Sequence, residues 1–103
     1  MRVFNLFILV GMAQTAFASW SFVKTQHSPS PRTSVAMASV PMKGNNGIGV
    51  LLFGGTDGES ASNFKNDTWL FDGHDWKELA QDGNVPAPRA IGSMVSFANG
   101  ALL

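Results

Sequence analysis

Two arginines carry the clearest chemical potential in this sequence, because each ends a Pro-x-Pro-Arg tetrapeptide. These are Arg32 and Arg89, and they lie 57 residues apart. A guanidinium binds a carboxylate through two parallel hydrogen bonds, so each arginine could bind a carboxylate ligand. The alternative to ligand binding is a structural role, in which each arginine forms a salt bridge or a backbone contact with nearby residues of the same fold. We therefore treat both arginines as candidates for a ligand-facing role, with the structural role left open.

A glycine pair could instead point to phosphate binding. Gly54 and Gly55 end the apolar run 48–53, and Gly58 follows three residues later. Neither glycine-rich phosphate-binding spacing is met, and no Lys-Ser or helical pattern follows. Glycine also permits a positive φ angle or close packing at a strand end. The glycines are therefore interpreted as structural.

Metal sites and cofactors are not expected. The loop 56–60 lacks the alternating acidic spacing of a calcium loop, so it is interpreted as a solvated loop. No further metal ligands occur at a recognisable spacing from His27 and His74. Both histidines are therefore interpreted as residues of surface turns. Asn66-Asp67-Thr68 matches an N-glycosylation acceptor, and whether Asn66 is modified stays open.

Composition narrows the functional classes. The 103 residues are 45% hydrophobic and 14% charged, with seven basic and seven acidic side chains. That balance suits one packed domain, and the absence of a basic stripe argues against a nucleic-acid partner. There is no cysteine and no tyrosine, so disulfides, thiolate ligands and tyrosyl chemistry are excluded for these residues.

The N-terminus has the pattern of a signal peptide. Arg2 precedes an apolar stretch over residues 3–13, and the small residues Ala16 and Ala18 follow. The apolar stretch is about half of the ~20 residues that span a bilayer. We expect cleavage after Ala18, a secreted or periplasmic product, and no stable membrane anchor after cleavage.

The remainder predicts an all-β fold. β-favouring runs at 35–40, 48–53, 68–71 and 76–79 are separated by turn residues, and helical spacing is absent. Each connection is local in the sequence, so residues 33–80 are predicted to form four antiparallel strands joined in order.

The chain also contains an internal repeat. Trp20 and its following residues match those of Trp76, and the residues 29–32 match 86–89. The same shift of 57 places Met37 on Met94 and Ser39 on Ser96. Asn99-Gly100 is expected to repeat the Asn46-Gly47 turn, with a register slip caused by a longer loop in the first copy.

These features resemble the kelch repeat, in which a strand ends in Gly-Gly and two spaced aromatics follow. The matching residues are Phe53-Gly54-Gly55, the segment 66–73, Trp69 and Trp76; Phe64 stands where the family often has tyrosine. The resemblance implies a kelch-type β-propeller, here incomplete, with about one four-stranded blade plus flanking strands. Residues 19–26 would form the last strand of a preceding or closing blade, residues 31–80 a full repeat and residues 86–103 the start of the next.

The resemblance implies that Trp69 and Trp76 pack between blades. It favours a non-catalytic, exported module that binds a protein or carbohydrate without a cofactor, as an N-terminal fragment of a longer protein. Self-association through exposed blade faces is also expected. Alternatives are part of an enzyme similar to a sialic-acid mutarotase or a galactose oxidase, or an inactive truncated product. The tyrosine and cysteine ligands of the oxidases are missing here.

Overall fold

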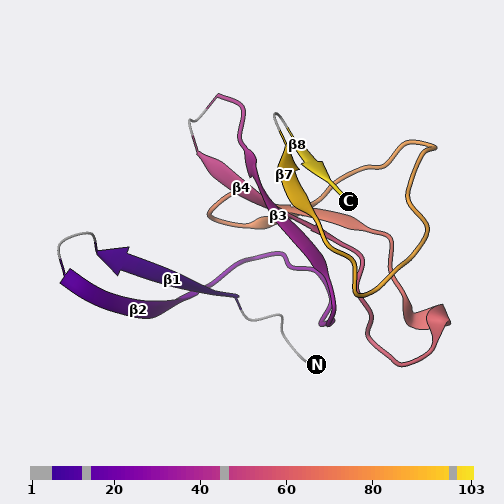
Figure 1. Ribbon diagram of the computed structural model, residues 1–103, viewed down its shortest axis with the longest axis horizontal. Coiled ribbons are helices and arrows are strands. Elements are labelled where there is room, and N and C mark those ends of the chain that lie inside the picture. The colour runs from indigo at the N-terminus through magenta and orange to yellow at the C-terminus, as the bar shows by residue number, and fades with distance from the viewer. Residues whose placement is uncertain (1–5, 13–14, 45–46, 98–99) are drawn as a thin grey trace.

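The residues that the structure describes form strands arranged in three antiparallel sheets (Figure 1). The structure is a computed structural model, and it describes residues 6–12, 15–44, 47–97 and 100–103. The strands are β1 Leu6–Met12, β2 Thr15–Val23, β3 Ala36–Pro41, β4 Ile48–Phe53, β5 Thr68–Phe71, β6 Trp76–Glu78, β7 Val95–Phe97 and β8 Gly100–Leu102, with a 3-10 turn η1 at Ala61–Asn63. No helix long and apolar enough to cross a membrane occurs within these described ranges. The prediction of an all-β fold is confirmed.

The central sheet has the order β3-β4-β5-β6, so each strand pairs with its neighbour in sequence. Its strands are rich in apolar residues, and polar turn residues separate them. Gly73 supplies a positive φ of 100° in the turn between β5 and β6. The predicted four-stranded antiparallel arrangement is confirmed, although Asn46 of the predicted β3–β4 turn lies outside the described residues.

The core lies on this sheet. Leu52, Phe71 and Trp76 form the buried cluster, and the rings of Phe71 and Trp76 have centroids 5.3 Å apart. Each fully buried side chain of this size contributes about 1.5–3 kcal/mol through removal of apolar surface from water. Trp76 is therefore a core residue, whereas Trp69 is half-buried and packs against the cluster.

A separate hairpin, β1–β2, projects from the central sheet (left in Figure 1). Trp20 lies opposite Leu9 in its register, and Ile8 and Val23 pack against the core cluster. The hairpin covers most of the predicted signal peptide and part of the strand expected at 19–26. Arg2 lies outside the described residues, and cleavage after Ala18 stays a prediction.

The third sheet, β7–β8, repeats the register of β3–β4. Ser39 lies opposite Val50, and Ser96 lies opposite Ala101. The matching residues are thus 57 apart in the first strand of each pair and 51 apart in the second, so the second copy has a loop six residues shorter. On the alignment that the repeat prediction uses, the register slip is six residues.

One detail of the repeat alignment changes. Gly100 lies opposite Phe97, as Gly49 lies opposite Val40, so the counterpart of Gly100 is Gly49 and not Gly47. Strand pairing determines this alignment, whereas the sequence match relied on the Asn-Gly dipeptide. Asn99 of that dipeptide lies outside the described residues.

Candidate functional site

Arg32 is held inside its own repeat by five hydrogen bonds. Its Nε donates to the Ser30 carbonyl (3.1 Å), and its Nη2 donates to Ser30 Oγ (3.0 Å). The carboxylate of Asp67 accepts from Nη1 at 2.5 Å and from Nη2 at 2.9 Å, and the Gly54 carbonyl accepts from Nη1 at 3.1 Å. A guanidinium has five N–H groups. The side chain of Arg32 is only 2% exposed, and these contacts use all five N–H groups. Arg32 therefore has the salt bridge and backbone contacts expected of a structural role, and it is not available to a ligand.

Asp67 is the centre of this network. Besides Arg32, the indole Nε1 of Trp69 donates to its Oδ2 at 2.8 Å. Burial acts to raise the pKa of Asp67, but the hydrogen bonds from Arg32 and Trp69 outweigh it and hold the pKa below its usual value. The carboxylate is thus ionised near neutral pH and ties the beginnings of β3 and β5 together.

Sequence reasoning missed this role of Asp67, because it considered the residue only within a glycosylation motif. The sequence nevertheless contains a pattern that predicts the contact between Asp67 and Arg32. In an antiparallel meander, alternate strands run in the same direction and begin at the same end of the sheet. An arginine just before β3 and an aspartate just before β5 are therefore brought together.

The glycine pair lies beside this network and leaves no room for side chains. Gly54 has φ of 70° and Gly55 has φ of 95°. A Cβ at Gly54 would lie 2.6 Å from the Arg89 carbonyl oxygen, and one at Gly55 would lie 2.7 Å from Cγ1 of Val35. The Gly55 N–H donates to that same Arg89 carbonyl at 2.9 Å. The second Pro-x-Pro-Arg backbone therefore crosses directly over the glycines of the first repeat.

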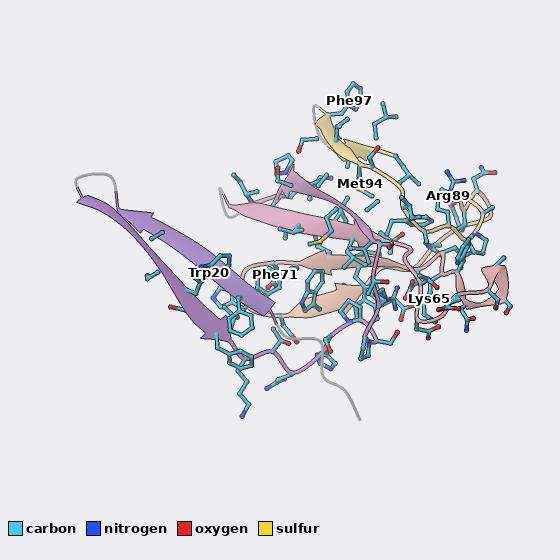
Figure 2. The ribbon with its side chains drawn as sticks, turned by 60° about the horizontal axis from the view of Figure 1, so that its bottom comes forward. Trp20, Lys65, Phe71, Arg89, Met94 and Phe97 are labelled. Carbon is cyan, nitrogen blue, oxygen red and sulfur yellow. The ribbon has the colours of Figure 1, made fainter. Side chains whose placement is uncertain are left out.

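Arg89 repeats only one of the contacts of Arg32. Its Nε donates to the Ala87 carbonyl at 3.1 Å, the same distance and spacing as Arg32 to Ser30. Arg89 is otherwise exposed, and no carboxylate among the described residues pairs with it (Figure 2). The structure thus places one arginine in a closed network and leaves the other open to solvent.

Two of the hollows on the described surface are lined by ionisable side chains that form ion pairs. One lies between residues 30–33 and 56–59, so hydroxyl groups and two carboxylates line it. Lys65 pairs with Asp57 at 3.1 Å and lowers the pKa of Asp57 through their hydrogen bond, while Glu59 is exposed. No group of three His, Asp or Glu side chains suited to a metal occurs in the part of the chain that the structure describes.

The second hollow lies beside β5 and β6, where His27 meets Asp75. Oδ2 of Asp75 lies 2.6 Å from His27 Nδ1, and its Oδ1 accepts the His27 backbone N–H at 2.8 Å. The pKa of Asp75 is lowered to about 2, first by the side-chain hydrogen bond with His27 and next by the hydrogen bond from its backbone N–H. His74 is separate: it is exposed, and its Nδ1 lies 4.0 Å from Asp72. The two histidines are not brought to one site.

Comparison with protein-family models, curated proteins and solved structures finds no match to this chain.

Proposed function

We propose that this chain is an exported, non-catalytic binding module of the kelch-propeller type. The observation that carries the proposal is the contact between Ser39 and Ser96. These residues are equivalent in the two repeats, and their Oγ atoms lie 2.9 Å apart. Two equivalent points related by a rotation approach each other only close to the rotation axis. In a propeller, the innermost strands of successive blades lie beside one central axis. In this proposal β3 and β7 are those innermost strands.

The kelch interpretation also draws support from the contact between the repeats. The backbone of Arg89 crosses Gly54 and Gly55, and the Ile91 N–H donates to the Ser34 carbonyl at 2.9 Å. Repeat units of this kind contact mainly their neighbours and bury one continuous core between them. In this proposal the Gly-Gly motif is the contact surface for the following unit.

We place ligand binding at the hollow between residues 30–33 and 56–59. Loops at the end of a β-sheet scaffold commonly carry binding residues. Hydroxyl and carboxylate groups such as those of Thr33 and Glu59 form hydrogen bonds with sugar hydroxyls and with peptide groups. The ligand class we propose is therefore a carbohydrate or a protein segment, bound without a cofactor.

Binding is tested by presenting the full chain to glycan and peptide arrays and measuring affinity for the best ligand by calorimetry. Glu59→Gln is expected to weaken binding, because it removes an exposed charge at the hollow. Lys77→Gln, an exposed change on β6, serves as the matched control. An affinity that is insensitive to Glu59 would contradict this site, and the absence of any ligand on both arrays would contradict the function.

Export is tested separately by expressing the full sequence in a bacterial host and sequencing the N-terminus of the protein in each fraction. We expect an exported product that begins at Ser19. A product that stays in the cytosol with residues 1–18 attached would contradict export. Light scattering on the purified protein tests self-association through the exposed sheet faces, for which we expect a concentration-dependent mass.

A further inference from the structure

We propose that folding closes the predicted cleavage site of the export signal, so that the chain is processed after Ala18 only before the β1–β2 hairpin forms. The bond between Ala18 and Ser19 lies inside β2. This inference rests on one part of the proposed function, namely that residues 1–18 form a cleavable export signal. It adds that the signal becomes a strand of the folded protein.

Pairing with β1 closes the cleavage site. Ala18 lies opposite Gly11, and Ser19 lies opposite Val10. The side chains of Ala18 and Ser19 are exposed, so the protection comes from the paired backbone and not from burial. The cleft of a peptidase accommodates a single extended segment. A segment held in a hairpin therefore has to open before it is cut, and the rate of cutting follows the population of the opened form.

The core of the central sheet holds the hairpin closed. Val23 lies opposite Leu6, and Ile8 is two residues further along β1, so Val23 and Ile8 share one face of the hairpin. Both pack against the buried cluster of Leu52, Phe71 and Trp76. A two-stranded hairpin by itself is only marginally stable in water. Opening the cleavage site also disturbs contacts with the core, and this lowers the population of the opened form.

The segment after β2 is fastened to the same sheet. The carboxylate of Asp75, in the turn between β5 and β6, accepts the backbone N–H of Gln26 at 3.0 Å and that of His27 at 2.8 Å. Its Oδ2 lies 2.6 Å from His27 Nδ1. β2 is thus joined to the central sheet through the side chain of Val23 and again through residues 26 and 27, so the hairpin moves away only if these contacts break.

An order of events follows from this arrangement. In an unfolded chain the export signal is free, and the bond after Ala18 can be cut. In a folded chain the same residues belong to β1 and to the first part of β2, and the bond is closed. A chain that folds before export therefore keeps residues 1–18. Cleavage also removes Ile8 from its place against the core cluster, so the hairpin does not form again once the signal has left.

The test measures cleavage of the purified full chain by a purified signal peptidase in detergent micelles, with mass spectrometry to locate the cut. The chain is presented folded and, in a parallel reaction, in enough urea to unfold it. A synthetic peptide of residues 12–26, which lacks most of β1, calibrates the enzyme in both buffers. After this calibration, we expect the unfolded chain to be cut after Ala18 about tenfold faster than the folded chain, or faster still.

Two matched valine changes in the folded chain test the anchoring by the core. Val23→Ala leaves residues 1–18 and the cleavage site unchanged but removes apolar contacts with the core, so it should be cut about fivefold faster than the parent. Val95→Ala removes the same groups from an exposed position on β7 and should be cut at the parent rate. Hydrogen exchange of the β2 amides measures the opening without the enzyme and should likewise be faster only in Val23→Ala.

Three results would contradict different parts of the proposal. Equal calibrated rates for the folded and unfolded parent chain would overturn the closure of the site and leave the export signal intact. Equal rates for Val23→Ala and Val95→Ala, with equal exchange of the β2 amides, would overturn the anchoring by the core. If neither the unfolded chain nor the peptide is cut after Ala18, while the enzyme processes a known exported precursor, the export signal of the proposed function is itself wrong.

Discussion

Ser39 and Ser96, which the repeat prediction treats as equivalent residues, contact each other. Their Oγ atoms lie 2.9 Å apart, and Ser96 Oγ also donates to the Ser39 carbonyl oxygen at 2.6 Å. Two residues that are 57 positions apart thus join β3 to β7.

Removing the Ser96 hydroxyl is expected to loosen the β7–β8 pair. Ser96→Ala loses both contacts, whereas Ser39→Ala keeps its backbone carbonyl as an acceptor and should have a smaller effect. A net contribution of about 0.5–1 kcal/mol predicts roughly threefold faster amide hydrogen exchange in β7 and β8. Ser62→Ala, which removes a hydroxyl paired with Ser60, is the control. Unchanged exchange in Ser96→Ala would refute the contact.

Arg32 and Arg89 are expected to differ sharply in their effect on stability. Arg32→Ala leaves the part-buried carboxylate of Asp67 without its guanidinium and should cost about 3 kcal/mol. Arg89→Ala removes an exposed side chain and should change stability by less than about 0.5 kcal/mol. Urea unfolding of both variants measures this difference, and similar losses would contradict the closed network. In Arg32→Ala the pKa of Asp67 should also rise, because burial then acts with less opposition.

Gly55 is expected to tolerate alanine less well than Gly73. Both have a positive φ, so alanine at either position meets backbone strain of about 1–2 kcal/mol. At Gly55 the new Cβ also lies 2.7 Å from Val35 Cγ1 and 2.8 Å from the Thr33 carbonyl oxygen, whereas at Gly73 nothing lies within 4 Å. We expect Gly55→Ala to cost roughly 3 kcal/mol in total. Thermal unfolding compares the variants, and equal costs would show that close packing at Gly55 is unimportant.

The pair of His27 and Asp75 makes part of the stability dependent on acid pH. The pKa of Asp75 is lowered from 3.8 to about 2, first by the side-chain hydrogen bond to His27 and then by its backbone N–H. Because the folded pKa is the lower one, this stabilisation is complete above about pH 4 and is lost as the pH falls toward 2. The Asp75 carboxyl signal in an NMR titration reports this directly.

His27→Ala should raise the pKa of Asp75 toward 3.8 while leaving it below that value, since the backbone N–H of residue 27 still donates. His74→Ala removes an exposed imidazole that is 4.0 Å from Asp72, so it should leave Asp75 unchanged. An Asp75 pKa that is the same in the parent and in His27→Ala would show that the side-chain hydrogen bond does not form.

The sequence by itself determined the all-β class and the strands of the central sheet. Runs at 35–40, 48–53, 68–71 and 76–79 correspond closely to β3, β4, β5 and β6. This succeeded because the signals are local: β-favouring residues form each strand, and adjacent turn residues end it. The internal repeat stays a prediction from the sequence, where its matched residues keep nearly constant spacing.

Only the tertiary structure decided what the two arginines do. Both arginines end a Pro-x-Pro-Arg tetrapeptide, yet Arg32 reaches a carboxylate 35 residues away and Arg89 has none beside it in the described chain. The role of a charged side chain depends on the partner that the fold brings to it, and local sequence carries no record of that partner's position. The same reason explains why the contacts of Asp67 and Asp75 became evident only when distant strands and turns were seen together.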